Sequence, residues 1–233
     1  MTKYGTAAEV SSAVFSEPPP GVIPLLPGSD QVAPARAAGS RAKRIMDVSV
    51  AVTLLLLLLP SLVLIALAIR LTSRGPVIFR QSRTGLNSEV FAICKFRTMH
   101  VLEDGEGISH ATRNDARVTH VGMFLRSTSL DELPQLWNVL NGHMSLVGPR
   151  PHAVAHDRRY GVLVSDYSRR FAVKPGITGL AQVRGLRGEI HDLSCMAERV
   201  RADCEYIERW SLRGDLAILL QTIPRVFGDR NAY

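Results

Sequence analysis

The amino-acid sequence predicts a mixed α/β fold that is mainly helical, with one N-terminal membrane helix and then a compact domain containing a few short strands. Three observations lead to this fold class. Residues 48–69 form an uncharged run of 22 residues, two short runs rich in β-branched and aromatic residues follow it, and apolar residues recur at helical spacing in much of the remaining chain. With 233 residues, 46% of them hydrophobic, the chain is long enough for one domain with extensions.

The charge of the chain is positive, which restricts the classes of partner. There are 28 Lys and Arg residues against 21 Asp and Glu, a net charge of +7. Such an excess favours anionic partners, namely phosphates, nucleic acid or acidic lipid head groups. The three cysteines, Cys94, Cys195 and Cys204, form no C-x-x-C pair. Their number and spacing exclude a secreted disulfide scaffold and indicate a reducing, cytoplasmic compartment.

Residues 1–40 are predicted to be a disordered tail. They hold six of the 13 prolines, among Ala, Ser and Gly, and show neither helical nor strand periodicity. They also lack the basic start and apolar core of a secretory signal, so we expect the tail to be retained. The folded part is expected to be one domain at residues 41–233, which includes the membrane helix at residues 45–70.

The apolar run at residues 48–69 is predicted to be this membrane helix. A straight α-helix of that length is roughly 33 Å long, enough to cross the hydrocarbon core of a bilayer. Six consecutive leucines at positions 54–59 make the run apolar on every side. A buried core helix is the alternative, but length and all-round apolarity favour contact with lipid.

The flanking charges favour a re-entrant topology for the helix. Pro60 lies near its middle, where the missing N–H group and the ring break or kink an α-helix. The positive-inside rule places basic residues at both ends on the cytoplasmic side. A helix that enters the membrane, is broken at Pro60 and leaves through the same face satisfies both observations; a kinked spanning helix is the alternative. The flanking basic residues are Arg41, Lys43, Arg44, Arg70, Arg74, Arg80 and Arg83.

The elements after the membrane helix are predicted from periodicity and turn signals. Residues 77–80 and 90–96 read as short strands around a turn-rich segment, and residues 103–114 as a polar loop. Residues 118–125 are apolar but too short to assign to either type. Three helices are expected: one carrying Leu133, Leu136, Trp137 and Leu140, a charged amphipathic one at 193–209, and a more apolar one at 216–226 that is broken at Pro224.

The chemically most informative segment is 126–136, where Asp131 and Glu132 stand at the predicted start of a helix. With Ser129 as N-cap, Ser129-x-x-Glu132 is a capping box and Glu132 has only a structural role. Pro134 argues against this placement, because it would be the fifth helical residue and would remove a hydrogen bond. With Asp131 as N-cap, Pro134 is the third helical residue, where no intrahelical bond is lost.

The second placement gives both acidic residues a chemical role. A carboxylate at a helix N-terminus faces the positive end of the helix dipole and stays ionised. An ionised Asp is a competent nucleophile toward phosphorus, and an adjacent Glu can hold the Mg²⁺ that neutralises a diphosphate. Asp131 and Glu132 are therefore the candidate catalytic residues and the candidate Mg²⁺ ligands.

Basic residues in turn-rich segments are candidates for binding phosphate. The planar fork of Arg suits phosphate oxygens, and loops flanked by Gly or Pro let backbone N–H groups approach as well. For each such residue alone, a surface or salt-bridged role is the alternative. No P-loop, G-x-G-x-x-G or zinc-type spacing is present. The candidates for the phosphate or nucleotide of a substrate are Lys95, Arg97, Arg117, Arg126 and Arg150.

An ordered set of motifs runs through residues 41–233. The motifs are Lys43-Arg-Ile-Met-Asp47, the apolar run with Pro60, Gly75-Pro-Val-Ile-Phe-Arg-Gln-x-Arg-x-Gly85, Lys95-Phe-Arg-Thr-Met99, Ser129-Leu-Asp-Glu-Leu-Pro-Gln-Leu136, Leu146-Val-Gly-Pro-Arg-Pro151 and Lys174-Pro-Gly-Ile-Thr-Gly-Leu-Ala-Gln-Val183. Together they resemble the bacterial sugar transferases, the monotopic polyprenyl-phosphate phosphoglycosyl transferases. Arg187-Gly-Glu and Tyr206-Ile-Glu-Arg-Trp-Ser-Leu are most similar to the undecaprenyl-phosphate glucose phosphotransferase branch.

This resemblance implies a reaction. The residue matching Asp131 attacks the β-phosphate of a UDP-sugar, UDP-glucose or UDP-galactose, and UMP leaves. The phosphosugar–aspartyl intermediate then gives its sugar phosphate to undecaprenyl phosphate, the first membrane step of exopolysaccharide biosynthesis. The residue matching Glu132 is associated with Mg²⁺, and those matching Arg126 and Arg150 with phosphate or nucleotide.

The resemblance also implies a location. The family's membrane helix is re-entrant and broken at a proline that matches Pro60, so we expect a monotopic enzyme on the cytoplasmic face of the bacterial inner membrane. Assembly into a homo-oligomer is left open. The alternative function is a membrane-anchored basic protein that binds nucleic acid or acts as a scaffold. The paired acids, and the absence of aromatic residues interleaved with basic ones, favour the enzyme, so no nucleic-acid partner is expected.

Overall fold

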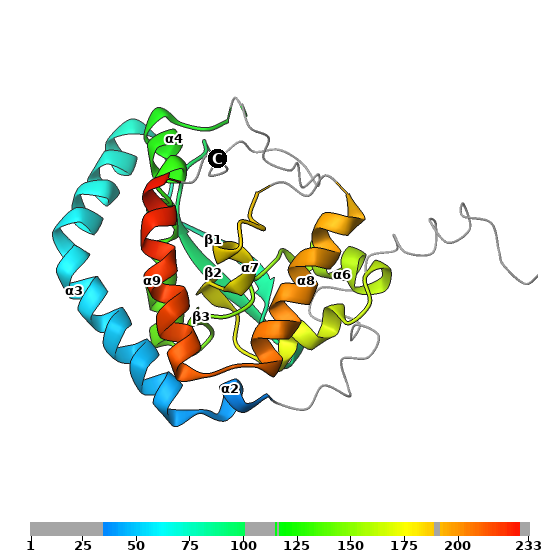
Figure 1. Cartoon of the computed structure of the whole chain (residues 1–233). Coiled ribbons are helices and arrows are strands. Elements are labelled where there is room, and N and C mark those ends of the chain that lie inside the picture. Colours follow the sequence, from blue (N-terminus) through cyan, green and yellow to red (C-terminus); the bar gives the residue numbers. More distant parts are fainter. Residues whose placement is uncertain (1–34, 101–114, 116, 189–191, 229–233) are drawn as a thin grey trace, which may run out of the picture.

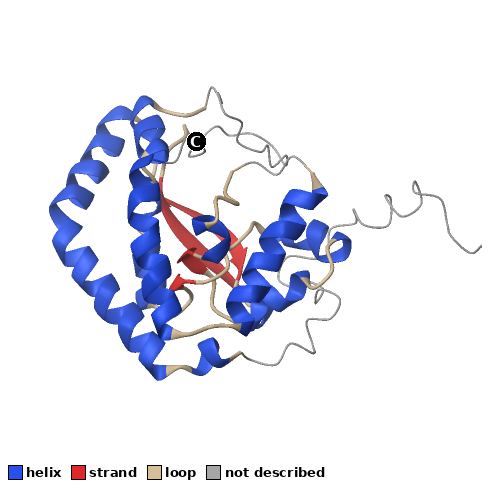
Figure 2. Cartoon of the chain, viewed as in Figure 1, coloured by secondary structure: helices blue, strands red, loops and turns tan. Residues whose placement is uncertain are grey.

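The computed structural model describes residues 35–100, 115, 117–188 and 192–228. These residues are mostly helical with a few short strands, which confirms the predicted composition of the fold (Figure 2). Most of the expected tail and the expected loop at 103–114 lie outside the described residues. The elements are α2 (Arg36–Gly39), α3 (Arg41–Thr72), β1 (Ile78–Thr84), η2 (Leu86–Ser88), β2 (Val90–Phe96), α4 (His120–Ser127), η3 (Leu130–Glu132), α5 (Gln135–Leu140), β3 (Ser145–Val147), α6 (Val154–Leu163), η4 (Tyr167–Ala172), β4 (Gly176–Thr178), α7 (Leu180–Val183), α8 (Leu193–Glu208) and α9 (Leu212–Gly228).

The strands of the described chain form two separate pairs. β1 and β2 are antiparallel and pair along their whole length, which confirms the two strands expected directly after the membrane helix. β3 and β4 are parallel, with Ser145 opposite Gly176. A Cβ atom at Gly176 would lie 2.1 Å from the backbone N of Gly148, so only glycine permits this close approach of the two chains.

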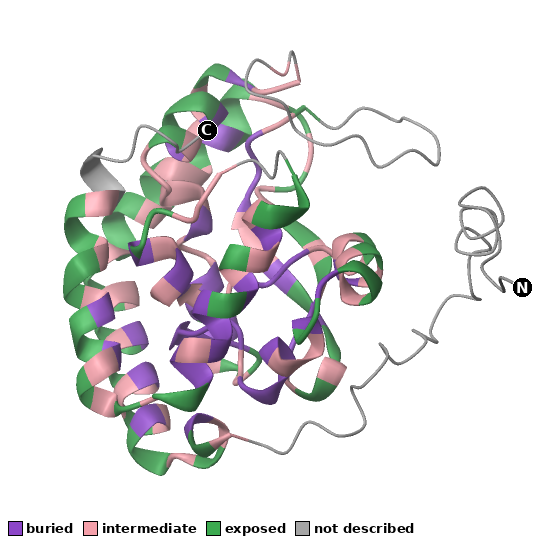
Figure 3. Cartoon of the chain, turned by 45° about the vertical axis from the view of Figure 1, so that its right-hand side comes forward, coloured by how far each residue is buried: buried purple, intermediate pink, exposed green. Residues whose placement is uncertain are grey.

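Helices enclose the strands on two sides. α3 and α9 lie on one side of the strands, and α6 and α8 lie on the other (Figure 1). The largest core cluster includes Ala51 of α3, Val139 of α5, Val147 of β3 and Ile218 of α9. Figure 3 shows that buried residues concentrate where these elements meet. One face of α3 therefore belongs to the domain core, and the other faces outward.

Helix α3 contains the predicted apolar run and is longer than expected. It has 32 residues, and it is the helix of the described chain that is long and apolar enough to cross a membrane. Only 6% of its most apolar 18-residue window is buried, and Leu57 and Leu64 are among its exposed side chains. The helix is not broken at Pro60, because helical structure continues through this residue. Instead, α3 is bowed along its length (Figure 1).

The N-terminal end of α3 is attached to the domain by a buried ionic network. Lys43 Nζ lies 2.7 Å from Asp215 Oδ2 of α9 and donates to the carbonyl oxygen of Val147 at 3.0 Å. The Tyr206 hydroxyl is 2.9 Å from Asp215 Oδ1, and Trp210 Nε1 donates to Asp215 Oδ2 at 3.0 Å. Asp215 is fully buried and Lys43 is 5% exposed. Each of these two buried charges is therefore stabilised by the other and by its hydrogen bonds, and burying either one without these partners would be costly.

The C-terminal end of α3 contacts the same domain. Arg97, at the end of β2, donates to the carbonyl oxygens of Ser73 and Pro76 and to the Ser73 hydroxyl, and so closes the last turn of α3. Ile69 is buried in a cluster with Phe96 and Leu125. Both ends of α3 are therefore held by one folded unit.

The remaining helices match the sequence predictions in part. α8 confirms the amphipathic helix expected at 193–209, and α4 accounts for most of the unassigned segment, with Thr119 Oγ1 accepting from Gly122 N at 2.9 Å as its N-cap. The predicted break at Pro224 is wrong, because α9 continues to Gly228. Pro224 is exposed, so the carbonyl group that loses its helical partner can bind water.

The network around Asp215 leads to a prediction about stability. Asp215→Ala removes the carboxylate that pairs directly with the buried Lys43 and leaves only the more distant Asp47 to oppose its charge, so we expect the free energy of unfolding to fall by about 3–5 kcal/mol, measured by denaturant unfolding in lipid nanodiscs. The control is Glu205→Ala, which removes an ion pair to Arg184 whose side chains are 35% and 45% exposed. Its expected loss is below about 1 kcal/mol. Equal losses in the two variants would contradict the role of the network.

Candidate active site

The paired acids lie in a short 3₁₀ turn between α4 and α5, and not at the start of an α-helix. η3 covers Leu130–Glu132, and α5 begins at Gln135, after Pro134 in the N-cap position. Ser129 adopts a left-handed conformation with φ 57° and makes no side-chain capping bond. The preferred N-cap, Asp131, is therefore wrong, and the alternative, Ser129, precedes the 3₁₀ turn without forming a capping box. Pro134 fits directly before the first helical residue because it has no N–H group to satisfy.

Glu132 is held between two cations. Lys95 Nζ donates to Glu132 Oε1 at 2.8 Å, and Arg150 donates to both carboxylate oxygens, at 3.1 Å for Oε2. Glu132 is 8% exposed. Burial acts to raise the pKa of this carboxyl, but the charges of Arg150 and Lys95 hold the pKa well below its usual range. Glu132 is thus an ionised, fixed side chain.

Asp131 differs from its neighbour in having no hydrogen bond within the described part of the chain. Burial and the negative charge of Glu132 raise its pKa to about 6, against the opposing charges of Lys95, Arg150 and Arg126. The prediction that a helix dipole keeps this group ionised is wrong, because no α-helix begins at Asp131. The site therefore contains two neighbouring acidic groups of different kinds. The Glu132 carboxylate is held in ion pairs, and the Asp131 carboxyl group accepts no hydrogen bond from the described residues.

The two cations are positioned by elements that pack behind them. Asn138 of α5 accepts from Cys94 N at 2.9 Å and donates to Ala92 O at 2.7 Å, which fixes β2 and therefore Lys95 against the acid pair. Arg150 follows β3 in the Gly-Pro-Arg-Pro loop. Its carbonyl oxygen accepts from Arg170 at 2.6 Å, and the buried Arg170 pairs with Asp203 of α8 at 2.8 Å.

The structure brings together three of the five predicted phosphate-binding residues. Lys95 and Arg150 contact Glu132, and Arg126 donates to Thr98 Oγ1 at 3.0 Å, close enough to Asp131 for the two charges to affect each other's pKa. Arg117 forms an ion pair with Asp115 at 2.7 Å, and it lies close enough to Arg126 for its charge to lower the pKa of that residue. Arg97 lies elsewhere, at the end of α3, where its guanidinium group binds backbone oxygens.

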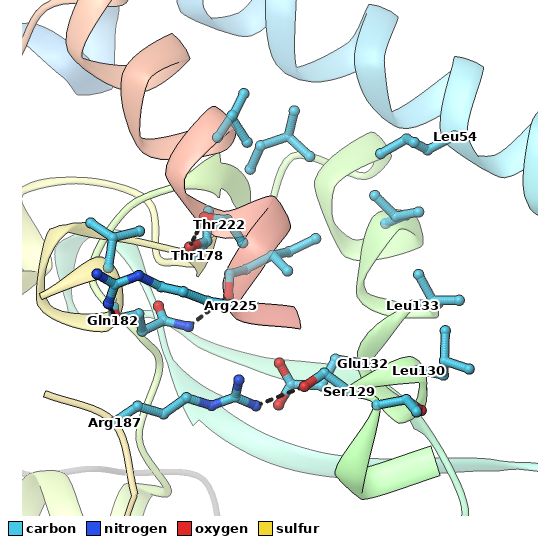
Figure 4. Close-up of a pocket in the computed structure, with 16 residues that line it drawn as sticks. Leu54, Ser129, Leu130, Glu132, Leu133, Thr178, Gln182, Arg187, Thr222 and Arg225 are labelled. Carbon is cyan, nitrogen blue, oxygen red and sulfur yellow. Dashed lines mark hydrogen bonds between the residues drawn. The ribbon is translucent and has the colours of Figure 1, made fainter. Parts of the chain in front are cut away.

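Two further arginines belong to the same positively charged region. Arg83 is close to Arg150, and burial together with the charge of Arg150 lowers its pKa to about 10. Arg187 donates to the Ser129 hydroxyl at 3.0 Å, directly beside the acid pair (Figure 4). Arg187 stands in the Arg-Gly-Glu motif of the sequence, but nothing in its spacing relates it to Ser129, which lies 58 residues earlier.

The donor set at the acid pair suits Mg²⁺. No group of three or more His, Cys, Asp or Glu side chains gathers within the described residues. Mg²⁺ commonly binds through one or two carboxylates and completes its shell with water and substrate phosphates. Glu132 already accepts three hydrogen bonds, whereas the oxygens of Asp131 accept none from the described residues. Asp131 therefore has free ligand positions, and Glu132 has one remaining lone pair.

A comparison with known protein families identifies the class of protein. The sequence model for the family described as bacterial sugar transferase matches residues 38–229. The chain therefore belongs to the bacterial sugar transferase family. It is an enzyme of the sugar-phosphate transferase class.

Individual relatives carry more specific names. The chain is 52% identical over 198 residues to the UDP-glucose:undecaprenyl-phosphate glucose-1-phosphate transferase of Caulobacter vibrioides. The aligned residues cover 85% of this chain and 74% of that protein. The Escherichia coli protein of the same name is 49% identical over 211 residues, covering 91% of this chain and 45% of that protein. The exopolysaccharide production protein ExoY of Rhizobium meliloti is 39% identical over 239 residues, covering 96% and 100%.

The raised pKa of Asp131 leads to a prediction about stability and pH. Its folded pKa of about 6 exceeds the ordinary value of 3.8, so the folded state holds a proton that the unfolded chain has lost. Stability therefore falls as the pH rises from about 4 to about 6, and the buried charge costs about 3 kcal/mol above that range. Asp131→Asn removes this cost.

We expect Asp131→Asn to unfold at higher denaturant concentration than the parent protein at about pH 8, and at the same concentration at about pH 4. The matched control is Glu198→Gln, an exposed carboxyl on α8, for which no pH-dependent difference is expected. A constant difference for Asp131→Asn across this pH range would contradict the assigned pKa.

Proposed function

We propose that this enzyme transfers a sugar 1-phosphate from a UDP-sugar to undecaprenyl phosphate and releases UMP. The names of the relatives support UDP-glucose as the first candidate donor and exopolysaccharide production as the pathway. The observation that carries the proposal is the acid pair. The Asp131 carboxyl group accepts no hydrogen bond from the described residues, so it is available to attack. It lies beside Glu132, which holds two cations at the site. A nucleophilic attack on a diphosphate needs both an available nucleophile and positive charge near the phosphate oxygens.

The first half-reaction forms a covalent intermediate on Asp131. A carboxylate oxygen of Asp131 attacks the β-phosphorus of the UDP-sugar, an O–P bond forms, and the bond between the β-phosphorus and the bridging oxygen breaks. The electron pair of that bond leaves with UMP. Arg126, Arg150 and Lys95 supply the positive charge that offsets the diphosphate as its charge shifts to the leaving group.

The second half-reaction returns the enzyme to its initial state. A phosphate oxygen of undecaprenyl phosphate attacks the phosphorus of the phosphosugar–aspartyl group. A new O–P bond forms in the lipid diphosphate-sugar, and the bond to Asp131 breaks with its electron pair on the carboxylate. Since the two substrates react in turn with one side chain, the kinetics are ping-pong.

Asp131 and Glu132 are also the proposed ligands of Mg²⁺. When bound, the ion supplies further positive charge to the diphosphate oxygens. Glu132 has a second role through its own contacts, because it orients Lys95 and Arg150 toward the same point. Both half-reactions therefore take place in a site where cations are fixed before the substrate arrives.

The proposed location is the cytoplasmic face of the bacterial inner membrane, with α3 as a re-entrant helix that is bent at Pro60. A straight helix of the length of α3 would be roughly 48 Å long and would carry its far end across the bilayer. Arg97 binds the backbone after α3 and Lys43 binds Asp215 before it, so one folded domain holds both ends. This supports an entry and an exit on the same side.

The nucleophile assignment is tested by a burst experiment. Enzyme mixed with UDP-glucose without the lipid acceptor is expected to release close to one UMP per active site. Asp131→Asn is expected to lower the burst at least about a thousandfold, since an amide cannot attack phosphorus. The control is Asp166→Asn, whose side chain is 63% exposed and whose burst should be unchanged. A full burst from Asp131→Asn would place the covalent step on another residue.

The burst rate also depends on pH. Only the deprotonated form of Asp131 attacks, so the rate constant should rise about tenfold per pH unit below about pH 6 and level off above it. Lys95 lowers the pKa of Asp131, and Lys95→Met should therefore move the inflection to higher pH in a stopped-flow pH series. An inflection at the same pH in both proteins would show that another group controls the rate.

A further inference from the structure

An apolar pocket of about 220 Å³ lies beside the acid pair (Figure 4). Glu132 and Ser129 form one part of its wall, so the pocket adjoins the acid pair, although Asp131 itself does not line it. The two half-reactions derived above assign no role to its other lining residues. The apolar residues of the wall are Leu54, Leu130, Leu133, Leu136, Leu146, Ile177, Val183 and Leu219.

The walls of the pocket suit a hydrocarbon better than a sugar or a nucleobase. Leucine side chains from α3, α5 and α9 offer no hydrogen bonds to hydroxyl groups or to a pyrimidine edge. Of the polar lining residues, the Thr178 and Thr222 hydroxyls bond each other at 2.8 Å, and the Gln182 amide donates to the carbonyl oxygen of Ile177. An apolar cavity of about 150 Å³ holds one benzene molecule, so this pocket has room for roughly one or two short branched hydrocarbon units. Leu54 belongs to α3, and the pocket therefore borders on the long apolar helix that is proposed to enter the membrane.

Positive charge is placed on the opposite side of the pocket. Arg187 donates to the Ser129 hydroxyl at 3.0 Å, and Arg225 of α9 donates to the carbonyl oxygen of Gln182 at 3.2 Å. Figure 4 shows both guanidinium groups on the side of the pocket away from Leu54. A ligand that combines an anionic head with an apolar chain matches this distribution of groups.

We propose that this pocket is the acceptor subsite, which holds the first isoprene units of a polyprenyl phosphate while its phosphate group lies near Arg187. This inference rests on the proposed function and adds to it the place where the lipid binds. The head of the lipid enters between α3, α5 and α9, and Arg187 guides its phosphate toward the phosphorus on Asp131. The rest of the chain stays in the membrane along α3.

The kinetic test fills the pocket from α9. Leu219→Trp places a larger ring in the pocket and is expected to raise the KM for polyprenyl phosphate at least tenfold, while the UMP burst without lipid stays within twofold of the parent protein. The matched control is Leu220→Trp, one residue further on the same helix, where the side chain is 68% exposed. Both parameters should be unchanged in this control.

The same assay tests the charged side of the pocket. Arg187→Gln is expected to raise the KM for the lipid at least fivefold, and Arg201→Gln, an exposed arginine of α8, to have no effect. An unchanged lipid KM in Leu219→Trp would overturn the proposal. So would a raised KM for the UDP-sugar together with an unchanged lipid KM, because the pocket would then hold the nucleotide.

A binding measurement on the parent protein makes the test independent of folding of the variants. A short polyprenyl phosphate with a diazirine on its first isoprene unit is photolysed with the enzyme in nanodiscs, and the labelled peptides are identified by mass spectrometry. Labels on Leu133, Leu136 or Leu219 support the subsite, and labels only on the outward leucines of α3 overturn it. An absent UMP burst in the parent protein would refute the proposed function instead, and the labelling pattern would still locate the lipid.

Discussion

The buried carboxylate of Glu132 organises the active site, because three segments of the chain meet at its two oxygens. Lys95 reaches it from a strand, Arg150 from the loop after β3, and the 3₁₀ turn that carries Glu132 also carries Asp131. Two cations compensate one charge, so a net positive charge remains beside Asp131. A buried group with such partners cannot move freely, and this rigidity fixes the uncommitted neighbour as well.

Helix α3 and the rest of the domain are parts of one folded unit. In the sequence, the positive charges near the ends of α3 indicate topology, but in the structure several of these residues form contacts within the domain. Lys43 pairs with Asp215 inside the domain, and Arg44 donates to the carbonyl oxygens of Val139 and Leu140 at the end of α5. Attachment at both ends of α3 supports the same topology more directly than charge counting does.

The sequence was sufficient for features that depend on local pattern and insufficient for those that depend on packing. Periodicity located α3, β1, β2 and α8, and the adjacent acids were found from their position before Pro134. The helix start at Asp131 was wrong, because a left-handed Ser129 and a 3₁₀ turn depend on contacts with β2 and α4 that no local pattern encodes. Arg97 and Arg187 show the same limit, since the first binds the backbone after α3 and the second reaches Ser129 from a distant segment.

The pairing of Lys43 with Asp215 has a consequence for biosynthesis. The two residues are 172 positions apart, so Lys43 emerges from the ribosome long before its counter-ion exists. Under the proposed topology, the apolar segment can enter the bilayer during that interval, but the ammonium group of Lys43 has to remain hydrated at the surface. Docking of α9 then brings Asp215 to Lys43. A ribosome that stalls before Asp215 has left the exit tunnel would thus leave a chain whose domain cannot close around Lys43.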